Sequence, residues 1–230
     1  AGEEQDTNSP GGGGLGMQER GSLTHIPAAR PEPKTPKGAA TRQRIIRAAR
    51  EELVERDGML EVDSVATRAQ VSVGALYRHF GSRAALVGTV VDDFYQRYRG
   101  EALEINPAPG QSFAVRERRR TELTAAFHYS DPLARVILSH LHLDAEVAAE
   151  EVSHIDAMID LAASVMALGQ KRGEVPADRD PRFIGAMIIG GMRHVLAIAL
   201  TSRPPIPQQT TADRLWVFNA AIMGLDLAGQ

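Results

Sequence analysis

Apolar residues recur at helical spacing along most of the chain from residue 41 onward, and no stretch of convincing length alternates like a half-buried strand. The pattern is sharpest over residues 62–80, where Gln70 and its neighbour separate two short amphipathic stretches. Ser72 stands where its hydroxyl can cap the second stretch, and Leu76 and Phe80 mark the apolar side of that stretch. Two short helices joined by a tight turn form a helix-turn-helix.

The same spacing predicts about nine helices in all, and therefore an all-α fold. Thr41 and Thr211 are expected to cap the first and the last helix, and Asp-Pro pairs open helices at Pro132 and Pro181. Gly100 is expected to end the fourth helix. The predicted helices span residues 41–56, 62–69, 73–80, 83–99, 112–128, 132–143, 146–172, 181–201 and 211–228.

Composition divides the chain into three parts. Residues 1–38 are rich in glycine and proline and hold too few apolar residues to repay the entropy of ordering, so a disordered tail is expected. The alternative is a basic arm that reaches a nucleic acid. Residues 39–99 form the predicted helix-turn-helix domain with its connecting helix. After a linker that contains proline and glycine, residues 100–230 form a second helical domain.

Composition and charge narrow the function classes. At 230 residues with 43% hydrophobic content, the chain can bury a sizeable core. Its net charge of −3 does not mark a nucleic-acid binder, so such a function depends on where the arginines lie. The absence of cysteine excludes disulfides, cysteine-ligated zinc and thiol catalysis. No run approaches the length of a membrane span and no signal-peptide pattern is present, so we expect a cytoplasmic protein without a membrane partner.

Patterns for catalysis and metal binding are weak. His154 and Met158 share a helix face, yet a lone histidine over an apolar stripe is more typical of a core. The chain has no nucleophile elbow and no phosphate-binding glycine loop. We therefore expect no metal and no cofactor, and a helical enzyme is the weaker alternative to a binding protein.

Residues 72–86 read Ser-Val-Gly-Ala-Leu-Tyr-Arg-His-Phe-Gly-Ser-Arg-Ala-Ala-Leu. This segment resembles the recognition-helix signature of the TetR family of one-component transcriptional repressors. The resemblance implies a homodimer that binds a palindromic double-stranded DNA operator and releases it when a small, largely apolar effector binds. A TetR-like regulator without an effector is the alternative. Three positions depart from the usual pattern: Gln70 replaces the turn glycine, Ala75 a threonine, and Glu61 a capping Thr or Ser.

The resemblance also implies which residues meet DNA. The start of the recognition helix would lie nearest the bases, and Arg78 would read a guanine. Hydroxyl, imidazole and guanidinium groups around it would contact phosphates, with further contacts from the helix before the motif. The predicted DNA-binding residues are Thr41, Arg42, Arg44, Ser72, Val73, Gly74, Ala75, Tyr77, Arg78, His79 and Arg83.

The second domain carries the remaining predictions. Gly190 and Gly191 each cost roughly 1 kcal/mol inside a helix, so a close helix contact or a ligand cavity is expected there, and we favour the contact. TetR relatives dimerise through their last two helices, which makes Gly190, Gly191, Trp216, Phe218 and Met223 the predicted interface. An adaptable, mostly apolar effector pocket is predicted from Phe127, His128, His154, Met158, Met166, Met187 and Arg193.

Overall fold

The computed structural model describes residues 35–139 and 145–226, and every regular element in these two ranges is helical. This confirms the predicted all-α fold with nine helices. The helices are α1 (Pro36–Glu55), α2 (Val62–Arg68), α3 (Val73–Phe80), α4 (Arg83–Tyr98), α5 (Phe113–Ser130), α6 (Pro132–Ser139), α7 (Ala145–Lys171), α8 (Pro181–Thr201) and α9 (Gln208–Met223), with one π-helical turn, η1 (Arg99–Leu103), after α4.

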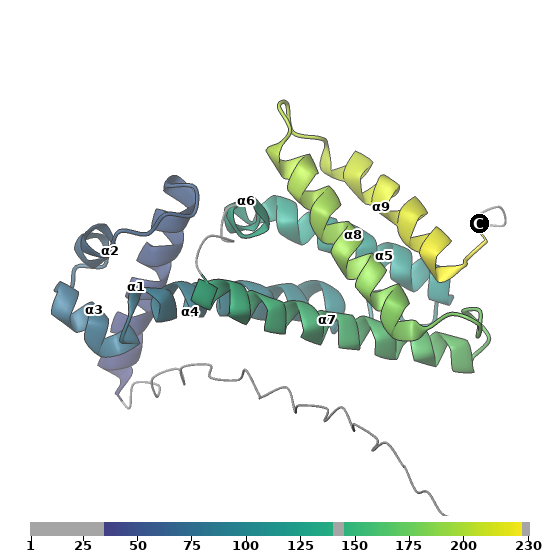
Figure 1. The fold of residues 1–230 in the computed structure, drawn as a ribbon, viewed down its shortest axis with the longest axis horizontal. Helices are drawn as coiled ribbons and strands as arrows, with labels where there is room; N and C mark the ends of the chain where they lie inside the picture. Colours follow the sequence, from purple (N-terminus) through teal and green to yellow (C-terminus); the bar gives the residue numbers. More distant parts are fainter. Residues whose placement is uncertain (1–34, 140–144, 227–230) are drawn as a thin grey trace, which may run out of the picture.

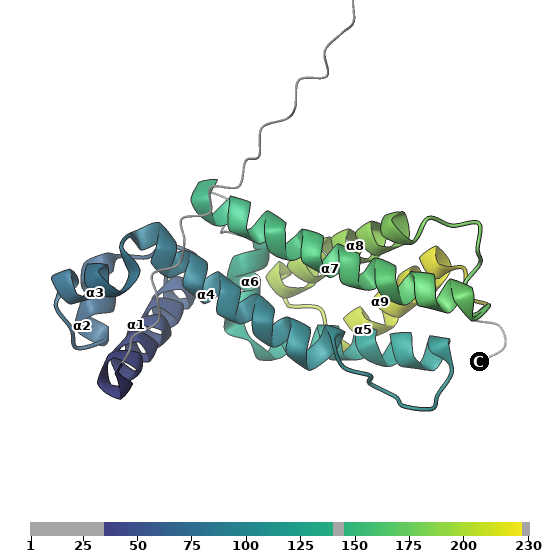
Figure 2. The same cartoon turned by 90° about the horizontal axis from the view of Figure 1, so that it is seen from below.

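The molecule is elongated, with α1, α2 and α3 grouped at one end (Figure 1). Helix α4 leaves this end and runs into the larger helical body, where α7 lies along it (Figure 2). Helices α8 and α9 pack side by side on one face of the body, over α5 and α7. A Cβ at Gly185 would lie 2.8 Å from the carbonyl oxygen of Ile159, so this glycine allows α8 to pack closely on α7.

The first helix begins earlier than predicted. The Thr35 hydroxyl, not that of Thr41, caps it by accepting a hydrogen bond from the Gly38 amide at 3.1 Å, and Pro36 occupies the first turn. The Thr41 hydroxyl instead donates to the Lys37 carbonyl at 2.9 Å. The last residues of the predicted tail therefore belong to α1, and the rest of that tail lies outside the described residues.

Other helix ends also differ from the prediction: α9 ends at Met223, before the left-handed Gly224, and not at residue 228. Gly100 does not end α4, because the chain continues through η1, where Arg120 donates to the carbonyls of Ala102 at 3.2 Å and Ile105 at 3.1 Å. These bonds satisfy carbonyls that a helix end leaves without partners. Helix α9 begins at Gln208 and not at Thr211, whose buried hydroxyl lies 2.8 Å from that of Tyr129.

A cluster of rings joins α4 to α5. The Phe94 and Phe127 rings lie 5.2 Å apart, and the Tyr98 ring packs against His128 at 4.7 Å. Burial lowers the pKa of His128 to about 4 and outweighs the hydrogen bond between its ring and the Thr124 carbonyl. His128 is therefore neutral at pH 7 and belongs to the core of the body.

Four charged residues, which we call the junction ring, connect the two parts of the molecule. Buried Asp131 follows α5 and accepts hydrogen bonds from Arg50 of α1 at 2.6 Å and from Arg97 of α4 at 2.7 Å. Asp93 completes the ring, 3.2 Å from Arg97 and 3.9 Å from Arg50. Asp131 also accepts from the Leu133 amide at 2.9 Å, which confirms its predicted role as the cap of α6. One carboxylate thus ties α1, α4 and α6 together.

Two helices, within Val147–Lys171 and Pro181–Thr201, are long and apolar enough to cross a membrane by length and composition alone. This differs from the expectation that no segment has such a length. One face of each helix packs against its neighbours, where Met158, Met166 and Leu196 are each less than 5% exposed, but only 17% of the apolar segment of the first helix and 39% of that of the second is buried.

Candidate nucleic-acid interface

The helix-turn-helix forms where it was predicted, from α2 and α3. Gln70 lies in the turn with a φ of 54°, a left-handed conformation that costs free energy for a residue with a Cβ. The amide of Val71 donates to the Ala66 carbonyl at 3.0 Å and closes the turn. The strain expected at Gln70 is therefore confirmed, and hydrogen bonds hold the turn in place.

Helix α3 has sharply defined ends and faces. The Ser72 hydroxyl accepts from the Ala75 amide at 3.1 Å, and Gly81, with a φ of 84°, ends the helix. Leu76 and Phe80 are buried, and Val73 packs partly against the core. The solvent side carries Gly74, Tyr77 and Arg78, with Ala75 and His79 half-buried. A Cβ at Gly74 would meet nothing within 4 Å, so the backbone at the start of α3 is open to a close approach.

Basic groups of α1 and α3 come together beside this helix. The guanidinium of Arg42, on α1, lies over the Phe80 ring, 5.0 Å from its centre. Arg44 is exposed, also on α1. Partial burial, followed by the charges of Arg78 and Arg42, lowers the pKa of His79. A phosphate beside His79 would oppose this shift, because a negative charge favours the imidazolium.

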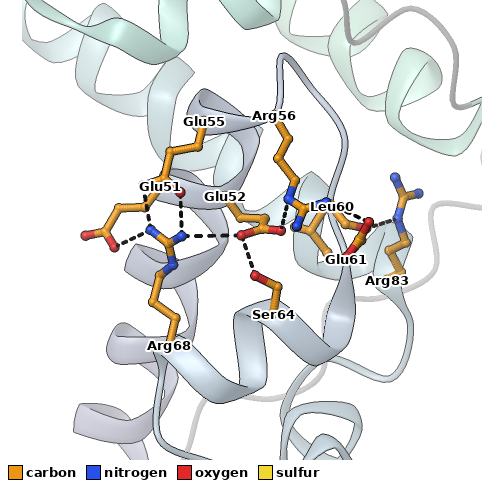
Figure 3. Close-up of polar contacts among 9 residues, drawn as sticks. All are labelled: Glu51, Glu52, Glu55, Arg56, Leu60, Glu61, Ser64, Arg68 and Arg83. Carbon is orange, nitrogen blue, oxygen red and sulfur yellow. Dashed lines mark hydrogen bonds and ion pairs between the residues drawn. The ribbon is translucent and has the colours of Figure 1, made fainter.

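Arg83 stands at the N-terminus of α4, next to the capping Ser82, whose hydroxyl accepts from the Ala85 amide at 3.0 Å. The Nε of Arg83 donates to the Leu60 carbonyl at 3.0 Å (Figure 3). This bond joins the loop after α1 to the start of α4, a contact that the sequence did not predict. Contact between Arg83 and a phosphate stays a prediction.

A charged network lies between α1 and α2, and sequence analysis missed it. We call it the Glu52 network; it centres on the carboxylate of Glu52, which is 1% exposed. Figure 3 shows ion pairs and hydrogen bonds linking this carboxylate to both helices. Glu52 falls seven residues after buried Ile45, at core-facing helical spacing, and a charge at such a position was the available signal. The members are Glu51, Glu52, Glu55, Arg56, Glu61, Ser64 and Arg68.

The predicted effector residues lie in different environments. Phe127, His128, Met158 and Met166 are buried in the body. The His154 ring stacks on Tyr95, with centres 4.8 Å apart, and its Nε2 lies 3.4 Å from Asp92.

Arg193 is already engaged by its neighbours. It forms an ion pair with buried Glu151 and donates to the Tyr95 hydroxyl at 2.9 Å. Tyr95 in turn donates to Glu151 at 3.0 Å, and burial raises the pKa of this tyrosine. Met187 does not lie in the interior with the other predicted methionines, because it faces out of α8 and is 52% exposed.

Some of the predicted interface residues are buried, and others are exposed. Trp216 and Met223 are 6% and 2% exposed, so they belong to the core of this chain and cannot be presented to a partner; that prediction was wrong. Phe218 is 44% exposed. A Cβ at Gly191 would lie 2.5 Å from the Phe218 ring, so the close contact expected there is with α9 of the same chain. A Cβ at Gly190 would meet nothing within 4 Å.

An apolar groove opens between α8 and α9. It has a volume of about 510 Å³, and Met187 and Phe218 are among the residues that line it. Across residues 35–139 and 145–226, no group of three or more His, Cys, Asp or Glu side chains is arranged to hold a metal ion.

Known proteins share both the motif and the fold. Residues 45–90, from α1 into α4, match the sequence model of the family described as "Bacterial regulatory proteins, tetR family". No curated protein sequence matches the chain significantly.

Among solved structures, GusR of Salmonella enterica is 20% identical with a TM-score of 0.68, covering 81% of this chain and 96% of its own. A putative TetR-family transcriptional regulator from a Rhodococcus species is also 20% identical with a TM-score of 0.68, over 80% and 98%. The fatty acid degradation regulator FadR from Bacillus halodurans is 15% identical with a TM-score of 0.66, over 81% and 96%. At these identities the likeness shows a shared fold, and with the family match over residues 45–90 the chain resembles TetR-family transcriptional regulators in both its helix-turn-helix and its architecture.

Proposed function

We propose that this protein is a transcriptional regulator of the TetR type: a cytoplasmic, ligand-responsive repressor that binds a palindromic operator as a homodimer. The observation that carries the proposal is the recognition helix α3, whose exposed Tyr77 and Arg78 and open backbone at Gly74 lie at one end of an elongated molecule. Residues 39–99 serve as the DNA-binding domain, and residues 100–230 hold the effector and the dimer interface.

Helix α3 enters the major groove by its N-terminal end. The residues nearest the bases are Val73, through its exposed edge, with Gly74 and Ala75, and Arg78 reads a guanine. Phosphates are contacted by side chains whose hydroxyl, imidazole or guanidinium groups surround α3. These are Thr41, Arg42, Arg44, Ser72, Tyr77, His79 and Arg83.

Two substitutions on α3 should separate positioning from base reading. Tyr77→Ala is expected to weaken binding to every duplex about equally, because a phosphate contact carries no sequence information. Arg78→Ala is expected to cost roughly 1–3 kcal/mol at one base pair and to relax specificity there. Fluorescence anisotropy on a duplex selected from a randomised library, and on its single-base variants, measures both effects.

Arg118→Ala is the matched control, since this arginine is exposed on α5 in the other part of the molecule. It should leave both affinity and specificity unchanged. If Tyr77→Ala binds DNA as tightly as the wild-type protein throughout a salt titration, the proposed assignment of the faces of α3 is wrong.

The proposed dimer face is the outer side of α8 and α9. It exposes five large apolar side chains: Phe183, Met187 and Phe218, which line the groove, and Ile198 and Val217, which do not. An apolar surface of this kind is costly in water and marks an interaction site. A second copy is the occupant we propose, because two helix-turn-helix units can read two half-sites about one helical turn apart.

We place the effector among α5, α6, α7 and α8, beside α4. Buried Met158 and Met166 can refit around ligands of different shape, and the Arg193–Glu151–Tyr95 group supplies polar contacts within this bundle. A ligand releases DNA only if it prefers the conformation that does not fit the operator. Helix α4 can transmit this preference, because it runs from Arg83 to the ring cluster at Phe94.

Met158→Trp is expected to abolish the ligand response by filling the space that the effector uses. A thermal-shift screen of lipophilic compounds on the wild-type protein supplies the ligand, which at a hundredfold excess over its Kd stabilises the fold by about 2.7 kcal/mol. The same compound should neither stabilise Met158→Trp nor release DNA from it.

Val152→Trp is the control for this experiment, because Val152 is 59% exposed on α7 and lies outside the proposed dimer face, so this variant should keep the ligand response. Full stabilisation of Met158→Trp by the compound would place the pocket elsewhere. A screen without a single stabilising compound would favour the effector-free alternative.

A further inference from the structure

Helix α2 has little apolar surface with which to define its position on α1. It has seven residues: Val65 and Ala66 are buried, and Val62 packs partly against the core. Small, smooth side chains leave the rotation and the axial position of a helix weakly specified, because packing specificity comes from interdigitating side chains. Something else must therefore define the position of α2.

The Glu52 network contacts α2 at both of its ends. Near the start of α2, the Ser64 hydroxyl donates to Oε2 of Glu52 at 2.7 Å. At its C-terminal end, Arg68 lies 3.5 Å from the same oxygen and 2.5 Å from Glu55. The hydrogen bond from Ser64 to Glu52 and those from Arg68 to Glu55 are directional, and with the Arg68–Glu52 ion pair they define both the rotation and the axial position of this two-turn helix.

The other oxygen of Glu52 extends the network to the loop before α2. Arg56 forms an ion pair with Glu52, 2.8 Å from Oε1, although this buried oxygen accepts no hydrogen bond. Arg56 also lies 2.6 Å from Glu61, which is the N-cap residue of α2 but makes no capping hydrogen bond. In Figure 3 Glu52 lies between Arg56 on one side and Arg68 on the other, with Ser64 facing it from α2. A single buried carboxylate thus joins α1, the loop and α2.

The energetics of buried ion pairs indicate that this carboxylate selects one arrangement of the helices and does not serve mainly to stabilise the fold. Replacing a buried ion pair by apolar residues of similar volume is often neutral or stabilising, since the charges lose hydration on burial. Buried polar groups are retained in some proteins because they select one arrangement among several of similar free energy. The recognition helix α3 follows α2 after only four residues, so the position of α2 also determines that of α3.

We propose that Glu52 is a positioning residue for DNA recognition: its carboxylate holds α2 on α1 so that α3 projects at the angle that base reading requires. The inference rests on the proposed role of α3 as the recognition helix. It makes Glu52 a determinant of specificity that need not touch DNA itself.

The test compares Glu52→Gln and Glu52→Met in the full-length protein. Neither variant leaves an arginine without a carboxylate, because Arg68 keeps Glu51 and Glu55 and Arg56 keeps Glu61. Asp63→Asn, at an exposed position in the first turn of α2, removes the same charge and is the matched control.

Two DNA probes separate base reading from general attraction. One is the duplex that the wild-type protein selects from a randomised library, and the other is a scrambled duplex of the same composition. We expect both Glu52 variants to lose about tenfold or more in affinity for the selected duplex, the size of one or two lost base contacts. Affinity for the scrambled duplex and the salt dependence should match those of Asp63→Asn, because the phosphate contacts persist.

Urea unfolding and circular dichroism report the fold of each variant. If both variants keep the wild-type ratio of affinities for the selected and the scrambled duplex, the inference is overturned. Loss of the fold in both would also overturn it, since Glu52 would then be a residue of structural stability. If the wild-type protein itself selects no duplex, the failure lies with the proposed function and not with the role of Glu52.

Discussion

Replacing Ile198 by glutamate is expected to produce a folded monomer with about a hundredfold lower operator affinity, the scale on which linked binding units strengthen one another. Ile198 is 62% exposed on the outer face of α8, so the single chain gains no buried charge. In a dimer built on this face, the carboxylate would be buried without a partner, and such burial is strongly unfavourable. Light scattering measures the mass, and anisotropy on the selected duplex measures the affinity.

Val115→Glu provides the comparison, because this valine is exposed on α5 and lies outside the proposed face. It should remain a dimer with wild-type affinity. An Ile198→Glu protein that stays dimeric and binds the operator normally would show that the two copies meet through another surface.

Asp131→Ala is expected to lower the free energy of unfolding by about 3 kcal/mol, the lower end of the cost of breaking a buried ion pair. Asp131 is buried, but its partners Arg50 and Arg97 are partly exposed and can regain water. Asp131→Asn should cost about 1 kcal/mol less, since asparagine caps α6 equally well. Urea unfolding measures both, and the exposed Asp63→Ala should stay within about 0.5 kcal/mol of the wild type.

The contribution of Asp131 should also depend on pH. Burial alone would raise the pKa of this carboxyl, but hydrogen bonds from Arg97 and the Leu133 amide, with the charge of Arg50, outweigh it and lower the pKa. A lowered folded-state pKa stabilises the protein fully above the unfolded value of roughly 3.9. The stability difference between wild type and Asp131→Asn should therefore shrink as the pH falls from roughly 5 towards 2. A constant difference over this range would mean that Asp131 is not the charged centre of the junction ring.

The helices and the DNA-binding motif could be predicted because their signals are local. Ser72 caps the helix that the pattern assigned to it, and Ser82 and Ser112 likewise precede and cap two of the predicted helices. The start of α1 was misplaced because Thr35 and Thr41 are both good caps, and the choice depends on whether Pro36 opens the helix.

The side of α9 that faces the core could not be read from the sequence. Leu215, Trp216, Val217 and Phe218 follow one another, so a 3.6-residue period does not distinguish inside from outside. The structure buries the first two and exposes the last two. The largest aromatic residue was consequently assigned to an interface when it belongs to the core.

Ion pairs between residues far apart in the sequence could not be predicted either. Arg50 and Asp131 are 81 residues apart in sequence, and Arg97 and Asp131 are 34 apart. In a linear reading, arginines on the first helix suit a solvated or DNA-facing surface, and only the packing of α6 on α1 shows that Arg50 is engaged inside the protein.

The junction ring also determines how far the DNA-binding end can exist by itself. An excised headpiece ending after α4 would keep Arg50, Asp93 and Arg97 but would lose Asp131, the buried acceptor that both arginines share. It would also lose the ion pair from Arg135 of α6 to Asp57 at the end of α1. Part of the stability of the headpiece therefore comes from its contacts with the helical body. The intact chain is expected to unfold on heating as one cooperative unit instead of two independent modules.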